Sequence, residues 1–146
     1  MSLPAVILVG GQGTRLLPLT ERTRKDMLPL VDRPLLAYTF EHLRRHGVRR
    51  CIVSCGYLPT QIREHFGDGS SLGVAIRYVE QKQTLGIAHA VMQLERHVHG
   101  PFLLFLGDIF YVARDLAALA RTFESGDIGA VLAVKRESDA IAIQKN

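Results

Sequence analysis

The chain has 146 residues, and its 18 lysines and arginines against 14 aspartates and glutamates give a formal net charge of +4. A length near the most common domain size predicts a single compact domain with one hydrophobic core. Hydrophobic residues make up 47% of the chain and charged residues 22%, which excludes a mainly disordered or collagen-like protein. The mild excess of positive charge favours a protein that handles anions such as nucleotides, phosphates or nucleic acid.

No apolar stretch approaches the roughly 20 residues that a membrane-spanning helix requires. The N-terminus reaches its first apolar run without a basic segment, unlike a secretory signal, so we expect a cytoplasmic protein that does not contact a membrane. Cys51 and Cys55 lie four residues apart in a strand-like run, too far apart for easy bridging. We interpret both as small buried hydrophobic residues.

The first half of the chain alternates predicted strands with predicted helices. Residues 5–9 form a continuous apolar run that ends in glycines, which predicts a strand buried on both faces. A helix is expected to follow Asp32, acting as its N-cap with Pro34 in the first turn, and to end at Gly47. Residues 51–55 predict the second strand of the sheet.

The middle of the chain continues this alternation. Pro59 begins a short predicted helix that closes at the Gly-Asp-Gly-Ser run of residues 67–70. Residues 74–79 alternate in polarity only in part, which predicts a strand near the edge of the sheet. A helix predicted over residues 86–95 directs three side chains inward: Ile87, Val91 and Leu94.

Five consecutive apolar residues, 102–106, predict the most central strand of the sheet. A helix over 115–124 and a strand over 128–134 follow, and residues 135–139 begin a further segment. The pattern predicts an α/β fold for residues 1–146, with a Rossmann-like, mostly parallel sheet and helices on both faces. Ligands of such a fold bind at the carboxyl ends of the strands.

The loop after the first strand contains Gly10, Gly11 and Gly13, which let backbone N–H groups approach an anion. A nucleoside-triphosphatase loop would need a Gly-Lys-Ser/Thr ending, and a dinucleotide-binding loop would need a glycine where Leu16 stands. Asp32 precedes a helix and does not end a second strand, which excludes a nicotinamide site. Taken alone, the loop fits either a phosphate-binding or a purely structural role.

The glycine loop opens a longer motif. Residues 8–20 (LVGGQGTRLLPLT), followed by Lys25 and by Leu28-Pro29, resemble the signature of the sugar-1-phosphate nucleotidyltransferases, also called nucleotide-sugar pyrophosphorylases. Further matches follow in the order of that family, so the resemblance covers essentially the whole chain: Gln81, residues 85–90 (LGIAHA) and residues 106–108 (LGD). Residues 67–70 and 85–90 are most similar to the glucose-1-phosphate thymidylyltransferases, with uridylyl and guanylyl enzymes close behind.

The resemblance implies a binding site for a nucleoside triphosphate. Gln81 would read the edge of a pyrimidine, because its amide both donates and accepts hydrogen bonds. The backbone of the first loop would hold the nucleoside and its phosphates, and the backbone at residues 86–87 would close over the base. The implied nucleotide-binding residues are Leu8, Val9, Gly10, Gly11, Gly13, Thr14, Gln81, Gly86 and Ile87.

The resemblance also implies three catalytic residues. Arg15 would bind the departing pyrophosphate as a forked cation, and Lys25 would neutralise charge between the sugar phosphate and the α-phosphate. Asp108 follows a buried strand at the ligand end of the sheet and would hold Mg²⁺, the implied cofactor. Outside the motif, Arg15 and Lys25 would be interpreted as surface cations and Asp108 as a helix N-cap.

The implied reaction is in-line attack of a sugar 1-phosphate on the α-phosphorus of a nucleoside triphosphate, with dTTP or UTP and glucose 1-phosphate favoured. No protein nucleophile is needed, because the attacking oxygen is already anionic. Asp26 stands where the family generally carries proline or glutamine, so it should turn away from the substrate or pair with Arg22 or Arg24. Val9 replaces the alanine usual in the family. This change should be tolerated, because the backbone and not the side chain at this position would bind the nucleotide.

The family domain continues beyond Asn146 with a Glu-Lys-Pro segment, a second metal-binding aspartate and a strand inserted beside residues 102–106. We therefore expect the chain to be the nucleotide-binding part of an enzyme and to be inactive by itself. Its open sheet edges are available to pair with another copy, so a homo-oligomer is one expected outcome. A non-catalytic nucleotide-sensing module and a mannose-1-phosphate guanylyltransferase-type enzyme are the alternatives. Nucleic-acid binding is disfavoured because no concentrated basic and aromatic surface is evident.

Overall fold

A computed structural model describes residues 3–56, 58–81, 83 and 85–134 of the chain. The chain divides into two compact units, Met1–Val112 and Ala113–Asn146. The first unit contains a four-stranded sheet in the order β5-β4-β1-β6, in which all neighbouring strands are parallel. These strands are β1 (Ala5–Val9), β4 (Arg50–Cys55), β5 (Ala75–Glu80) and β6 (Leu103–Leu106). The predicted α/β class is confirmed.

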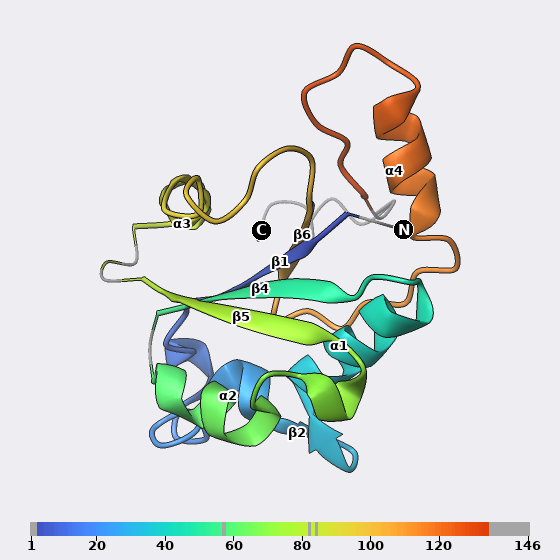
Figure 1. Cartoon of the computed structure of the whole chain (residues 1–146). Coiled ribbons are helices and arrows are strands. Elements are labelled where there is room, and N and C mark those ends of the chain that lie inside the picture. Colours follow the sequence, from blue (N-terminus) through green and yellow to red (C-terminus); the bar gives the residue numbers. More distant parts are fainter. Residues whose placement is uncertain (1–2, 57, 82, 84, 135–146) are drawn as a thin grey trace, which may run out of the picture. The chain divides into compact units, whose positions relative to one another are not determined.

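Helices cover both faces of this sheet (Figure 1). Helices α1 (Leu35–Arg45) and α2 (Pro59–Phe66) lie on one face, where Phe40 and Phe66 meet edge to face with ring centroids 5.1 Å apart. Helix α3 (Ile87–Met92) lies on the other face, and Ala90 packs there with Val6 of β1. Because strand side chains alternate between faces, β1 serves both layers and all of its residues are buried.

Shorter elements connect these layers. The 3₁₀ turn η1 (Thr14–Leu16) follows the glycine loop, and η2 (Lys25–Met27) precedes a two-stranded hairpin of β2 (Pro29–Leu30) and β3 (Arg33–Pro34). A third 3₁₀ turn, η3 (Ser70–Leu72), leads into β5. The prediction of Asp32 as a helix cap is wrong, because Asp32 lies in the hairpin turn and accepts a hydrogen bond from the Tyr38 hydroxyl at 2.9 Å. Helix α1 begins at Leu35, after β3.

Several sequence predictions of the first unit are confirmed. The strands at residues 5–9 and 51–55, the helix that begins at Pro59 and the edge position of β5 are all as expected. Cys51 and Cys55 are free and buried, and burial raises the pKa of the Cys51 thiol to about 12 and that of Cys55 to about 11. Both thiols are therefore inert at neutral pH.

The prediction that residues 102–106 form the most central strand is wrong. In the described part of the chain, β6 lies at the edge of the sheet and pairs only with β1. Leu104 is 44% exposed as a result. The apolar run indicated that both faces of β6 are apolar, but it carried no information on whether a second strand pairs with it.

Helix α3 is shorter than the predicted segment 86–95, and Ile87 does not point inward, because its side chain is 53% exposed at the start of the helix. Leu94 is buried as expected, in the turn that follows the helix. Within the described residues, no helix is long and apolar enough to cross a membrane.

The second unit contains α4 (Ala117–Glu124) within the predicted helix 115–124. The side chain of Asp115 accepts a hydrogen bond from the Ala118 backbone N–H at 3.2 Å ahead of the helix. The strand predicted over 128–134 is not formed, and Leu132 and Val134 are exposed. A strand needs a hydrogen-bonded neighbour, and none of the described strands pairs with this segment. The segment predicted at 135–139 lies outside the described residues.

Candidate functional site

A cavity of about 380 Å³ opens at the carboxyl ends of β1 and β6. Its floor is formed by the ends of these two strands, and its walls come from the glycine loop, η2, the residue after β5 and the start of α3. The lining residues are Leu8, Val9, Gly10, Gly11, Gln12, Lys25, Asp26, Gln81, Gly86, Ile87, Ala90, Leu106 and Asp108. The cavity therefore lies where a parallel sheet places its ligands.

Two glycines allow the polar walls of the cavity to approach one another. A Cβ atom added to Gly11 would lie 2.9 Å from Nζ of Lys25, so a larger residue here would push the end of the lysine side chain away from this loop. A Cβ atom added to Gly107 would lie 2.3 Å from Cγ1 of Val9, so only glycine lets the chain pass the end of β1 before it reaches Asp108. Both glycines keep Lys25 and Asp108 close to the glycine loop.

Lys25 and Asp108 form an ion pair across the cavity, between Nζ and Oδ2. The lysine comes from η2 and the aspartate from the residue that follows Gly107 at the end of β6, so the fold joins positions far apart in sequence. Their side chains are 26% and 35% exposed, respectively. The pair is therefore in contact with solvent, and an incoming ligand can reach both groups.

A second ion pair is formed by the two residues that flank Lys25 in the sequence. The Arg24 guanidinium donates from Nε to Oδ1 of Asp26 and from Nη2 to Oδ2, both at 2.9 Å. The two side chains are 0% and 1% exposed. Nη2 also donates to the backbone carbonyl of Val9, the last residue of β1. Asp26 thus pairs with Arg24, one of the two partners expected for it, and its charge is neutralised before any ligand enters.

Gln81 reaches the cavity from the end of β5 and is almost fully buried. Its backbone N–H donates to the carbonyl of Cys55 at 2.7 Å, and its side-chain Nε2 donates to Oγ of Ser54 at 2.7 Å. Ser54 is itself completely buried in β4. These two bonds fix the amide group of Gln81, and Ser54 is a supporting residue that sequence reasoning missed.

Most of the predicted site residues line this one cavity, and Gly13, Thr14 and Arg15 do not. Thr14 and Arg15 lie in η1 and are exposed. The Thr20 hydroxyl donates to the carbonyl of Gly13 at 2.7 Å and closes the loop that carries them. The roles of these three residues stay predictions.

Sequence reasoning missed three of the lining residues. Ala90 lies three residues after Ile87, so helical spacing could have placed both on the cavity side of α3. Gln12 lies inside the motif of residues 8–20 and Leu106 inside that of residues 106–108, and in both motifs the implied roles belong to neighbouring residues. The sequence named Arg24 only as one of two candidate partners of Asp26, and its full burial and its hydrogen bond to Val9 had no signal in the sequence.

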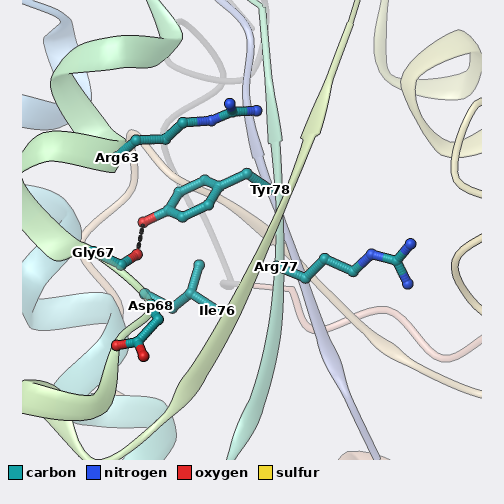
Figure 2. A pocket seen from close by; sticks show the side chains of 6 residues that line it. All are labelled: Arg63, Gly67, Asp68, Ile76, Arg77 and Tyr78. Atoms are coloured by element: carbon teal, nitrogen blue, oxygen red, sulfur yellow. Dashed lines mark hydrogen bonds between the residues drawn. The ribbon is translucent and has the colours of Figure 1, made fainter.

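A second cavity, of about 540 Å³, lies between the end of α2 and β5 (Figure 2). The Tyr78 hydroxyl donates to the carbonyl of Gly67 at 2.8 Å, and the Arg63 guanidinium lies 5.5 Å from the centre of the Tyr78 ring. Burial raises the pKa of Tyr78 to about 12, and Arg77 points away from this group. None of the predicted site residues lines this cavity, so it is separate from the site described above.

The chain is similar to known proteins over most of its length. A family model described as nucleotidyl transferase matches residues 4–141. A UTP--glucose-1-phosphate uridylyltransferase of Haloferax volcanii is 38% identical over 111 residues, which cover 76% of this chain and 45% of the relative. A glucose-1-phosphate thymidylyltransferase of Streptomyces antibioticus is 34% identical over 125 residues, which cover 85% of this chain and 35% of the relative.

A mannose-1-phosphate guanylyltransferase of Mycobacterium tuberculosis is 35% identical over 136 residues, which cover 92% of this chain and 38% of that protein. Among solved structures, a UDP-glucose pyrophosphorylase complexed with UDP-glucose matches with a TM-score of 0.70 and 26% identity, over 86% of this chain and 52% of that one. The chain thus spans less than half the length of these three curated relatives. The names of the relatives share one reaction class and differ in the base and the sugar.

Proposed function

This chain belongs to the nucleotidyl transferase family, and on that premise we propose that it forms the nucleotide-binding part of a sugar-1-phosphate nucleotidyltransferase. The proposed reaction transfers a nucleotidyl group from a nucleoside triphosphate to a sugar 1-phosphate and releases pyrophosphate. One observation carries the proposal: the glycine loop, Lys25 and Asp108 meet in a single cavity at the carboxyl ends of β1 and β6. The proposed substrates are dTTP or UTP and glucose 1-phosphate.

The cavity suits a triphosphate because the backbone of the glycine loop and the ammonium group of Lys25 face the same space. The open backbone of Gly10 and Gly11 offers N–H groups to the phosphates, and Nζ of Lys25 lies beside it. Lys25 is proposed to neutralise the repulsion between the sugar phosphate and the α-phosphate as they approach. Arg15, exposed on η1 outside the cavity, is proposed to bind the departing pyrophosphate.

The donor set at Asp108 fits a magnesium ion that is shared with phosphates. The described residues contain no group of three or more histidine, cysteine, aspartate or glutamate side chains that could hold a metal by themselves. Mg²⁺ typically takes one or two carboxylates and completes its shell with water and phosphate oxygens, which a single exposed aspartate allows. When bound, the ion would screen the phosphate charges. Asp108 would hold it, and Lys25 would then be free to move to the phosphates.

Gln81 is proposed to select the base. With one N–H of Nε2 donated to Ser54, the orientation of the amide is fixed and the side-chain oxygen can accept a hydrogen bond in the cavity. Thymine and uracil present an imide N–H that fits such an acceptor, whereas cytosine presents an acceptor at the same position. This arrangement supports dTTP or UTP as the donor and disfavours CTP.

The test uses the full-length gene product that contains this chain. Pyrophosphate release is measured with each common nucleoside triphosphate, with and without hexose 1-phosphates, in the presence of Mg²⁺. We expect release that depends on both substrates and is highest with dTTP or UTP, and we expect Asp108→Asn to abolish it. A matched control, Asp68→Asn, changes an aspartate of the second cavity and should leave the rate unaltered.

Other outcomes of this experiment separate the alternatives. Nucleotide binding without pyrophosphate release from the full-length protein would overturn the enzymatic proposal in favour of a nucleotide-sensing module. Release that is highest with GTP and mannose 1-phosphate would retain the reaction class and overturn the proposed preference for dTTP or UTP and glucose 1-phosphate.

A further inference from the structure

The two residues that flank Lys25 form the most deeply buried ion pair among the described residues. Arg24 and Asp26 are joined by two parallel hydrogen bonds of 2.9 Å each, and neither side chain is exposed by more than 1%. Full burial of two charges carries a large desolvation penalty, so such pairs contribute little net stability. Arg24 Nη1 is also buried without an acceptor in the described part of the chain. This unsatisfied donor further reduces the net contribution of the pair to stability.

Arg24 connects the pair to a strand and to a helix of the fold. Nη2 of Arg24 donates to the carbonyl of Val9, which ties η2 to the last residue of β1. The backbone N–H of Arg24 donates to Oε1 of Gln61 on α2 at 3.1 Å, and Nε2 of Gln61 donates to the carbonyl of Arg22 at 2.6 Å. The backbone that precedes Lys25 is thus held against the strand and the helix, and Asp26 after it is held to Arg24. The lysine side chain projects from this fixed base toward Gly11 and Asp108.

We propose that Arg24 and Asp26 are positioning residues for Lys25. The inference rests on the proposed function, because it assigns the pair to the placement of the proposed catalytic lysine. A lysine side chain is long and flexible, so its ammonium group is placed precisely only if its backbone is fixed. Misplacement of a reacting or neutralising group by about 1 Å can slow a reaction by about 100-fold. The buried pair supplies the fixed backbone, and Lys25 supplies the charge that reaches the ligand.

A purely structural role for the pair makes a different prediction. If Arg24 and Asp26 only stabilised the fold, any replacement that preserved stability would preserve turnover. The double substitution Arg24→Met with Asp26→Leu separates the two roles, because apolar side chains of similar volume commonly replace a buried ion pair without loss of stability. It removes the hydrogen bonds to Asp26 and to Val9 together.

The first measurement is steady-state kinetics of the full-length protein. For the double variant we expect an unfolding midpoint within a few degrees of the unaltered protein, a kcat lower by about 100-fold and a nearly constant KM for the triphosphate. Arg24→Lys keeps the charge balance but cannot bond both Asp26 oxygens and Val9 at once, so it should show a smaller loss of kcat. The matched control is Asp115→Asn with Arg121→Gln, which removes an exposed ion pair of the second unit and should change neither constant.

The second measurement does not depend on catalysis. The rate at which an amine-reactive acylating reagent modifies Lys25 is followed by peptide mass spectrometry, with the other three lysines of the chain as internal references. Release of Lys25 from Asp108 should raise its modification rate by about fivefold in the double variant, the factor expected for loss of an exposed ion pair. Because this readout needs no substrate, it tests the positioning role even if the full-length protein releases no pyrophosphate.

The outcomes are decisive in both directions. A stable double variant with reduced kcat, constant KM and faster Lys25 modification supports the positioning role. A stable double variant in which kcat and the Lys25 modification rate both equal those of the unaltered protein overturns it. If the double variant does not fold, Arg24→Lys decides by the same two readouts, and unaltered values in that variant overturn the proposal.

Discussion

Two ion pairs stand side by side at the end of β1, and they differ in almost every physical property. Arg24 and Asp26 are buried, joined by two parallel hydrogen bonds and tied to the backbone of β1. Lys25 and Asp108 are partly exposed, joined by one contact and surrounded by the cavity. A buried pair cannot exchange its partner without a large cost, whereas a pair open to solvent can. The comparison separates a fixed scaffold from groups that are available to a ligand, although both use the same kind of interaction.

The two pairs should differ most in how much the protein is destabilised when the aspartate of each pair is neutralised. Asp26→Asn leaves the Arg24 charge in an interior without a counter-charge, and we expect the free energy of unfolding to fall by about 3–5 kcal/mol. Chemical denaturation measures this loss. The same substitution at Asp108 should cost less than about 1 kcal/mol, because Lys25 remains solvated. Equal losses at the two positions would contradict the distinction between the pairs.

Lys25→Ala breaks the exposed pair and tests its chemical role. We expect kcat of the full-length protein to fall by about 100-fold, because one positioned charge near the transferring phosphate is lost. The KM for the triphosphate should change much less, and the free energy of unfolding should stay within about 1 kcal/mol of the original. Single-turnover and steady-state pyrophosphate assays measure the rates. An unchanged turnover number would exclude Lys25 from the chemistry.

The glycine loop shows how far the sequence predicts this site. Residues 5–13 encode a buried strand and a flexible turn by local pattern alone, and the position of the cavity follows from the rule that ligands bind at the carboxyl ends of parallel strands. The family resemblance predicts that Lys25 neutralises phosphate charge and that Asp108 holds Mg²⁺ at the same site. The ion pair between these two side chains depends on the tertiary structure, because η2 and the end of β6 are far apart in the sequence.

The features that the sequence did not predict depend on neighbours that lie far away in the chain. The edge position of β6 depends on whether another strand pairs with it, and the strand predicted over 128–134 is not among the described strands. The sequence offers Arg22 and Arg24 equally as partners of Asp26, and only the contacts of Arg24 with Val9 and Gln61 decide between them. Local periodicity indicates which face of a helix or strand is apolar. It does not indicate which distant strand or side chain that element will contact.

The exposed pair should also respond to a competing cation. If Asp108 binds Mg²⁺, Lys25 and the metal compete for the same carboxylate, since one positive charge repels another. We therefore expect Lys25→Ala to tighten the binding of Mn²⁺, a spectroscopic substitute for Mg²⁺, by about tenfold in the absence of nucleotide. Electron paramagnetic resonance of free Mn²⁺ measures this affinity, and Asp108→Asn in the same background should abolish the gain. Equal affinities with and without the lysine would show that Asp108 does not hold the metal.

Salt gives the mildest way to separate the two pairs, because it requires no substitution. The Debye length falls from about 10 Å at 0.1 M to about 3 Å at 1 M ionic strength, so only the pair in contact with solvent is screened. We expect the acylation rate of Lys25, relative to the other lysines, to rise about twofold over this range, since an exposed ion pair contributes less than about 1 kcal/mol. The hydrogen-exchange rate of the Arg24 guanidinium protons, followed by NMR, should stay constant because the buried pair excludes both water and ions. A guanidinium that exchanged faster at high salt, in step with the Lys25 rate, would mean that the two pairs open together and that no rigid base exists beneath the lysine.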